Sequence, residues 1–304
     1  MSLSCSSGGR QIMLYNLEND ILCVQVRSYG AELRSLKERA DETEYLWDGN
    51  PQWWKYSSPV LFPIVGKLQD GKYRVHGKEY KLPGHGLGRI SEYQLVERRN
   101  DYIEFSLQWS EESLAVYPWK FKLNVAYALQ DNTVEVIWKV QNLDTQEMIY
   151  SIGAHTAFRC PLVHGESFSD CYLTFNQAED NINMPLNSKG QFLQVPGQAR
   201  LQGQQLNLNY EMFAGDALAY KGLKSDEVSI CSHKSDKKVT MVAKDFPFWG
   251  FWTPAQGGAP FICLEPWQGH ADYEGYDGEF EAREGSLKLA AGATQSFHYI
   301  IKIG

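Results

Sequence analysis

Three short stretches of the chain hold polar residues that could do chemistry beside glycines or aromatic rings. In FICLEPWQGHAD (261–272), Glu265 ends an apolar run and is followed by Pro266 and Trp267, with Trp249 and Trp252 upstream. Flat rings pack on the C–H faces of a sugar, and burial beside them raises a carboxyl pKa towards that of a useful general base. Alternatively, Glu265 is a charged residue at the lip of a buried strand and the tryptophans are core.

Two histidines have similarly open surroundings in the sequence. His155 follows an apolar run through Gly153 and Ala154, in YSIGAHTAFRCPL (150–162), and the ordinary histidine pKa of about 6.5 allows a general acid role. His85 lies between two glycines in PGHGLGR, with Arg89 four residues further on. Glycines let the backbone approach a ligand closely. A core histidine and a flexible loop would look the same, so no stretch identifies a function by itself.

Period-two alternation of apolar residues predicts the strands that must position these groups. It recurs at 21–26, 102–109, 121–129, 133–143, 228–233, 239–246, 261–267 and 296–303. The residues QDN (130–132) predict a tight hairpin turn. Ser110 is the predicted cap of one short helical turn.

The order of these elements favours an all-β fold. Many strands, short turns and no composition break predict one domain over residues 1–304, a large antiparallel sandwich of two broad sheets. Residues 1–11 are polar and small, lack the apolar core of a signal peptide, and are expected to be a disordered leader.

Composition excludes several classes of protein. The net charge is −8 and no dense basic run occurs, which argues against a nucleic-acid partner. No apolar stretch is long enough to predict a membrane span. The six cysteines form no CxxC pair and several lie in apolar runs, so we expect buried thiols in a reducing compartment. A cytoplasmic protein is therefore expected.

Five motifs taken together carry a resemblance that none carries alone. LFPIVGKLQDGKY, LPGHGLGR, IGAHTAF, GDALAYKGLKS and CLEPWQGHAD occur in this order. Their sequence and spacing resemble the aldose 1-epimerase (galactose mutarotase-like) family, especially its LacX-like branch, from about residue 12 to the C-terminus. The resemblance implies a large antiparallel β-sandwich with a sugar cleft on a concave sheet.

The resemblance also implies a reaction, the interconversion of the α and β anomers of a hexose by ring opening. The matched positions make Glu265 the base that takes the C1 hydroxyl proton, and His155 the acid that protonates the ring oxygen. No metal or organic cofactor is implied, and the partner is a small sugar. The residues implied or favoured for sugar binding are His85, Lys67, Asp216, Arg89 and Trp252.

Two departures from the family pattern leave the sugar open. Lys67 stands where an arginine is usual, and lysine lacks the planar fork that binds paired hydroxyls. Thr156 stands where a proline is usual. Whether the sugar is phosphorylated and how the chain assembles are not readable from the sequence.

Three other functions stay open at this point. A hexose-6-phosphate 1-epimerase would need a cationic pocket, and a carbohydrate-binding protein would need no acid–base pair. A metal enzyme is weakly supported because no HxH or HxxxH spacing occurs. The candidate phosphate ligands are Lys67, Arg89 and Arg159, and the candidate metal ligands are His85, His155 and His270.

Overall fold

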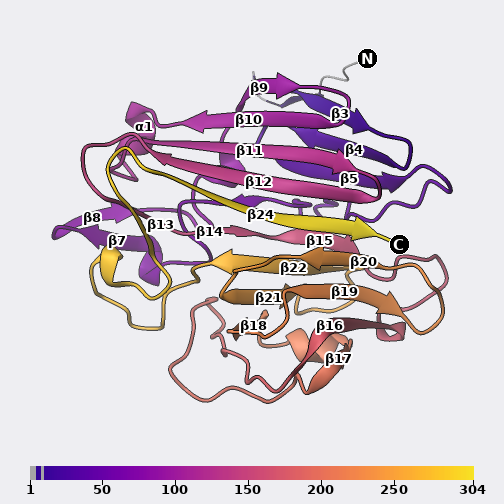
Figure 1. Cartoon of the computed structure of the whole chain (residues 1–304). Helices are drawn as coiled ribbons and strands as arrows, with labels where there is room; N and C mark the ends of the chain where they lie inside the picture. Colours follow the sequence, from indigo (N-terminus) through magenta and orange to yellow (C-terminus); the bar gives the residue numbers. More distant parts are fainter. Residues whose placement is uncertain (1–4, 8–9) are drawn as a thin grey trace.

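The computed structural model describes residues 5–7 and 10–304, and it has the predicted architecture of a large antiparallel β-sandwich (Figure 1). Of the predicted leader, residues 1–4 and 8–9 lie outside the described residues. Among the helices that the structure describes, none is long and apolar enough to cross a membrane.

One layer is a nine-stranded sheet that runs in Figure 1 from β9 at the top to β17 at the bottom. In spatial order its strands are β17 (Gly203–Asn207), β16 (Cys171–Glu179), β19 (Glu227–Ser232), β20 (Val239–Val242), β24 (Thr294–Ile303), β12 (Thr133–Asn142), β11 (Phe121–Gln130), β10 (Tyr102–Gln108) and β9 (Gln94–Arg98).

The second layer is a six-stranded sheet that carries the candidate site. Its strands are β18 (Leu218–Lys221), β21 (Phe248–Trp252), β22 (Phe261–Gln268), β14 (Ile152–Ala154), β6 (Val60–Leu61) and β15 (Thr156–Arg159), which also pairs with β22.

Smaller elements complete the described part of the chain. A three-stranded sheet holds β3 (Leu14–Glu18), β4 (Leu22–Arg27) and β5 (Glu32–Glu38), and pairs form from β1 (Cys5–Ser7) with β2 (Arg10–Ile12), β7 (Lys72–Val75) with β8 (Lys78–Lys81), and β13 (Met148–Tyr150) with β23 (Leu287–Leu289). The α-helix is α1 (Glu111–Leu114), and the short 3₁₀ turns are η1 (Gln69–Gly71), η2 (Gly88–Ile90), η3 (Phe168–Asp170), η4 (Tyr210–Phe213) and η5 (Phe280–Ala282).

The local predictions for turns and caps are confirmed. β11 and β12 pair from Phe121↔Asn142 to Gln130↔Thr133, and Asp131 at their turn has a φ of 50°. Aspartate tolerates this left-handed conformation better than most residues. The Ser110 hydroxyl caps α1 by accepting a hydrogen bond from the Ser113 N–H at 3.2 Å.

Aromatic side chains fill the space between the two main sheets. Phe175 of β16 meets Phe251 of β21 edge-on, with ring centroids 5.7 Å apart. Phe121 of β11 packs at 5.1 Å on Phe62, which follows β6. These contacts pack the six-stranded sheet on the nine-stranded one.

Strand β22 is buried on both faces over all eight of its residues. Ile262 and Leu264 belong to the core between the sheets. Cys263 and Trp267 belong instead to two smaller apolar clusters on the outer face of the six-stranded sheet. Glu265 lies between them, at the fifth of the eight positions. The interpretation that Glu265 stands at the lip of a strand is therefore wrong, because the strand continues to Gln268.

A large ring beside Glu265 depends on two glycines in the neighbouring strands. A Cβ added at Gly250 of β21 would lie 2.3 Å from Cζ2 of Trp267, and one at Gly153 of β14 would lie 2.7 Å from its Cδ1. The indole also donates its Nε1–H to the Ala154 carbonyl at 3.2 Å. Trp267 therefore lies flat across both strands and forms the floor next to Glu265.

We expect Gly250→Ala to lower the free energy of unfolding by about 1 to 3 kcal/mol, because the added methyl overlaps the Trp267 ring. Urea denaturation measures this loss. Gly215→Ala is the matched control, since a Cβ at Gly215 meets nothing within 4 Å, and it should change stability by no more than about 0.5 kcal/mol. Equal losses in both variants would contradict the flat packing of Trp267.

Candidate active site

A cavity of about 210 Å³ opens over the middle of β22. Six of the seven residues expected at the site line it: Glu265, His155, His85, Lys67, Asp216 and Trp252. They come from separate parts of the chain, and the fold brings them together. Its apolar walls include Trp54, Val65, Leu186, Phe192, Trp267 and Ala271.

Arg89 is the predicted site residue that does not line this cavity. Its Nη2–H donates to the Gly84 carbonyl at 2.7 Å, and its guanidinium lies 4.9 Å from the centre of the Tyr56 ring. Arg89 therefore supports the loop that carries His85. Arg159, the other arginine considered for a phosphate, also lies outside the lining and donates its Nε–H to the Leu46 carbonyl at 3.2 Å.

Glu265 is a carboxyl group in an apolar setting, with 2% of its surface exposed. It is paired with Gly250 in the ladder between β21 and β22. Burial raises the pKa of the Glu265 carboxyl well above its usual range, and the nearby Asp216 charge raises it further. The predicted upward shift is thus confirmed, with desolvation as its main cause.

His155 lies between β14 and β15 and faces Glu265. Its Nε2 is 3.4 Å from Oε2 of Glu265, and the residue is 7% exposed. Burial lowers the His155 pKa well below its usual value, and the neighbouring His85 and Arg89 act in the same direction. Burial favours the neutral form of both partners. The one proton that Glu265 and His155 can exchange is therefore on the Glu265 carboxyl.

His85 is a neutral hydrogen-bond donor held by the backbone of Gly66, in the segment that carries Lys67. Its Nδ1 accepts a hydrogen bond from the Gly66 N–H at 3.2 Å, so the ring proton is on Nε2. Burial, aided by Arg89 and Lys67, lowers the His85 pKa to about 3. The backbone at His85 has a φ of 64°, an uncommon conformation for a residue with a Cβ. His85 therefore presents a fixed N–H at neutral pH.

Lys67 and Asp216 lie close together at the rim. A Cβ added at Gly190 would be 3.3 Å from Nζ of Lys67 and 3.4 Å from Oδ2 of Asp216. The Ala217 N–H holds the Asp216 carboxylate by donating to Oδ1 at 2.9 Å. An ammonium donor and a carboxylate acceptor side by side suit the hydroxyl groups of a sugar.

A buried ion pair behind the cavity supports the backbone of Lys67. Arg283 donates to Asp272, and both side chains are 3% exposed. The Asp272 N–H donates to the Lys67 carbonyl at 2.9 Å. Oδ2 of Asp272 accepts from the Gln69 N–H at 2.7 Å. The position of Lys67 thus depends on residues far away in the sequence.

Sequence reasoning missed Trp54 and the 186–192 segment. The Trp54 ring stacks on the His155 imidazole, with centroids 4.5 Å apart and an interplanar angle of 27°. Trp54 and Trp252 also line a second cavity of about 550 Å³ that adjoins the first, with Leu186 and Asp216 shared between them. The Trp53–Trp54 doublet in NPQWWKY is the signal that could have found this wall.

One group of described residues brings together three possible metal ligands. Ligand atoms of His155, Cys263 and Glu265 all lie within 4.8 Å of one another. Nδ1 of His155 has no hydrogen-bond partner in the described structure, although metal-binding imidazoles usually have one. His270, part of the metal alternative, instead packs edge-on against Phe248 at 4.8 Å.

The raised pKa of Glu265 predicts how stability depends on pH. The pKa of Glu265 in the folded protein lies above the pKa of about 4.3 that it has in the unfolded chain. The folded protein therefore loses stability as the pH rises from about 4.3 towards the folded-state pKa. Glutamine does not ionise, so Glu265→Gln should become progressively more stable than the wild type as the pH rises above about 5. Urea denaturation across this range measures the difference. Glu112→Gln is the control, because the pKa of the exposed Glu112 carboxyl is lowered by its hydrogen bond to Ser110, and it should show no such growth. A flat difference for Glu265→Gln would contradict the shift.

Comparison with known proteins agrees with this geometry. The aldose 1-epimerase family profile matches residues 13–287. The chain is 36% identical over 265 residues to Protein LacX, chromosomal, of Lactococcus lactis subsp. lactis. The aligned region covers 84% of this chain and 88% of that protein. A galactose mutarotase related enzyme from Lactobacillus acidophilus has a TM-score of 0.90 at 30% identity, covering 96% of this chain and 97% of that one. A galactose mutarotase-like protein from Lactobacillus casei has a TM-score of 0.89 at 27% identity, covering 96% and 100%. The chain belongs to the aldose 1-epimerase family.

Proposed function

We propose that this protein interconverts the α and β anomers of an aldose, with Glu265 and His155 as its acid–base pair. The observation that carries the proposal is the 3.4 Å contact between Oε2 of Glu265 and Nε2 of His155 in a cavity that also holds a fixed donor, His85. Ring opening removes a proton from the C1 hydroxyl and delivers one to the ring oxygen. Both oxygens are bonded to C1, so the acid and the base must be neighbours, as these two groups are.

The proton count of the pair suits a reaction that consumes no net proton. In the empty cavity burial favours the proton on Glu265. The C1 hydroxyl of a bound sugar donates to Glu265 and stabilises its carboxylate, while the existing proton passes to His155. Glu265 then takes the hydroxyl proton as base and His155 protonates the ring oxygen. Rotation about C1–C2 and closure with reversed roles give the other anomer and restore the pair.

The other cavity residues bind and orient the sugar. The Nε2–H of His85 donates to the ring oxygen of the sugar. The His85 ring stays neutral at neutral pH because its pKa is about 3. Lys67 and Asp216 bind hydroxyls at the rim, and Trp252 packs on a C–H face of the ring. The chemistry needs no cofactor, because both proton transfers use side chains of this chain.

The same residues favour a free sugar over a phosphorylated one. Among the residues that line the cavity, Lys67 is the one with a permanent cationic side chain, and the Asp216 carboxylate lies next to it. A phosphate would be repelled by the Asp216 carboxylate. Arg89 and Arg159, which could have neutralised the phosphate, lie outside the lining. A hexose 6-phosphate is therefore the comparison substrate rather than the proposed one.

We expect Glu265→Gln and His155→Gln each to lower the rate of anomer exchange by about 10²- to 10⁴-fold, because each removes one proton transfer. Saturation-transfer NMR on a panel of free aldoses and hexose 6-phosphates measures the exchange and identifies the sugar. The matched controls are Glu135→Gln and His298→Gln, which alter a solvent-exposed Glu–His contact of 2.6 Å between β12 and β24. They should keep the wild-type rate. Wild-type exchange in either cavity variant would refute the assignment, and binding without any exchange would indicate a carbohydrate-binding protein.

A further inference from the structure

The orientation of His155 is not explained by hydrogen bonds. Its Nδ1 has no partner among the described residues, and its Nε2 has a single contact, with Glu265 at 3.4 Å. Catalytic histidines are usually oriented by a group on the nitrogen away from the reaction. One contact at one nitrogen leaves the ring free to turn, so another feature must hold it.

Aromatic packing supplies the missing constraint. Trp54 covers one face of the imidazole at 4.5 Å and 27°. Trp252 and His85 meet the ring nearly perpendicularly, at 5.5 Å and 81° and at 5.4 Å and 76°. A face contact with two edge contacts fixes the plane of the ring, and Trp54 makes the face contact.

Trp54 is itself held by backbone hydrogen bonds. Its N–H donates to the Asn50 carbonyl at 3.0 Å, and its carbonyl accepts from Nε1 of Trp47 at 2.8 Å. The Trp47 N–H in turn donates to the Ala157 carbonyl at 3.0 Å, two residues after His155. The segment that carries Trp54 is thus tied to the strand that follows the histidine.

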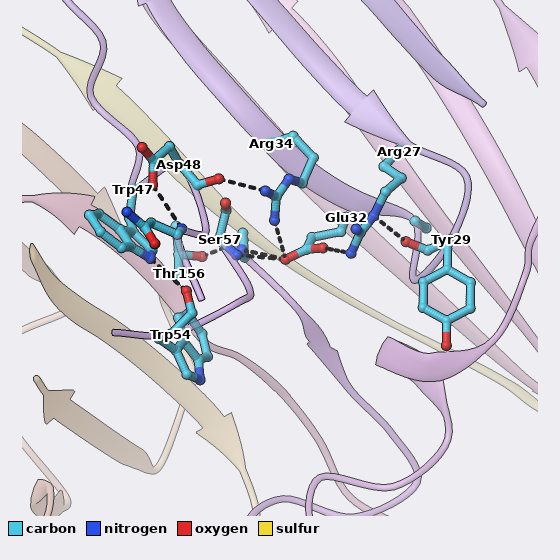
Figure 2. Close-up of polar contacts among 12 residues, drawn as sticks. Arg27, Tyr29, Glu32, Arg34, Trp47, Asp48, Trp54, Ser57 and Thr156 are labelled. Atoms are coloured by element: carbon cyan, nitrogen blue, oxygen red, sulfur yellow. Dashed lines mark hydrogen bonds and ion pairs between the residues drawn. The ribbon is translucent and has the colours of Figure 1, made fainter. Parts of the chain in front are cut away.

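A buried carboxylate fixes both ends of this segment, as Figure 2 shows. Glu32, at the start of β5, is 1% exposed and accepts from the Ser57 N–H at 2.6 Å and the Ser58 N–H at 3.2 Å. Arg34 bridges Glu32, at 3.4 Å, and the Asp48 carbonyl, at 2.6 Å. Arg27 completes the ion pairing of Glu32. One carboxylate therefore anchors residues 48 and 57 on either side of Trp54.

The far end of the segment also contacts the chain next to His155. The Ser57 carbonyl accepts from the Ala157 N–H at 2.8 Å, and the Ser58 hydroxyl lies 2.8 Å from that of Thr156. Thr156 is one of the two residues that depart from the family pattern. A proline there would provide no hydroxyl for this contact.

We propose that Trp54 is a positioning residue for His155 and that Glu32 holds Trp54 in place through the 48–57 segment. The inference rests on the proposed function, because it concerns how the acid of that reaction is oriented. A misplacement of about 1 Å in a reacting group can cost about 10²-fold in rate, so loss of the stack is expected to appear in kcat.

The test compares variants of the two adjacent tryptophans. Trp54→Leu removes the stacked ring, Trp54→Phe keeps an aromatic face, and Trp53→Leu is the control, since Trp53 lines the outer cavity but not the one that holds His155. The first readout is NMR of the His155 ring, assigned by its loss in His155→Gln. The second is kcat and KM for anomer exchange.

We expect Trp54→Leu to remove the ring-current shift of the His155 protons, to broaden them, and to lower kcat by about 10- to 100-fold. Trp54→Phe should recover most of kcat, and Trp53→Leu should leave the ring signals and kcat near wild type. Glu32→Gln should broaden the same signals without touching the cavity. If Glu32→Gln does not fold, Arg34→Gln takes its place. It removes the hydrogen bond to the Asp48 carbonyl, keeps the ion pair of Arg27 with Glu32, and should broaden the same His155 signals.

The two readouts separate this inference from the proposed function. Ring signals and kcat in Trp54→Leu that match those of Trp53→Leu would overturn it. A loss confined to KM, with the His155 signals unchanged, would also overturn it, since Trp54 would then only contact the sugar. If no aldose is a substrate, the NMR comparison still decides whether Trp54 orients His155.

Discussion

The burial of one carboxyl group inside a β-sheet is the constraint on which the rest of this structure depends. Glu265 lies in the middle of β22, is 2% exposed, and has Nε2 of His155 at 3.4 Å. An isolated charge there would be very costly, so the pair adopts neutral forms that share one proton. The two proton-transfer roles that we propose for the pair depend on this same burial.

The surrounding fold supplies groups that the pair itself lacks. His85 and Asp216 reach the cavity from loops with φ values of 64° and 85°. Non-glycine residues in this region carry strain, which persists where surrounding contacts enforce it and is often found at functional sites. Here the contacts are the Gly66 N–H on His85 and the Ala217 N–H on Asp216. The strain thus accompanies a fixed donor and a fixed acceptor that face one cavity.

How far the sequence predicts this structure depends on the range of the interactions involved. β10, β11 and β12 alternate clearly, so their positions could be read from local pattern. Alternation predicted a strand over 261–267, whereas the end of the apolar run at Glu265 suggested the lip of a strand. In the folded sheet the pairing continues through Pro266↔Trp249 and Trp267↔Phe248, so the strand runs on. Motif order led to the cavity residues. The Trp53–Trp54 doublet marks an aromatic wall, but no local pattern shows that Trp54 stacks on His155, about a hundred positions away.

The protonation state of Glu265 at neutral pH tests the account most directly, and it can be measured without knowing the sugar. The experiment is an infrared difference spectrum between the wild type and Glu265→Gln, with Glu112→Gln as reference because the pKa of the exposed Glu112 carboxyl is lowered by its hydrogen bond to Ser110. We predict that Glu265→Gln removes a protonated carboxyl band, whereas Glu112→Gln removes an ionised one. An ionised carboxylate at Glu265 in the empty protein would contradict a neutral pair that shares one proton.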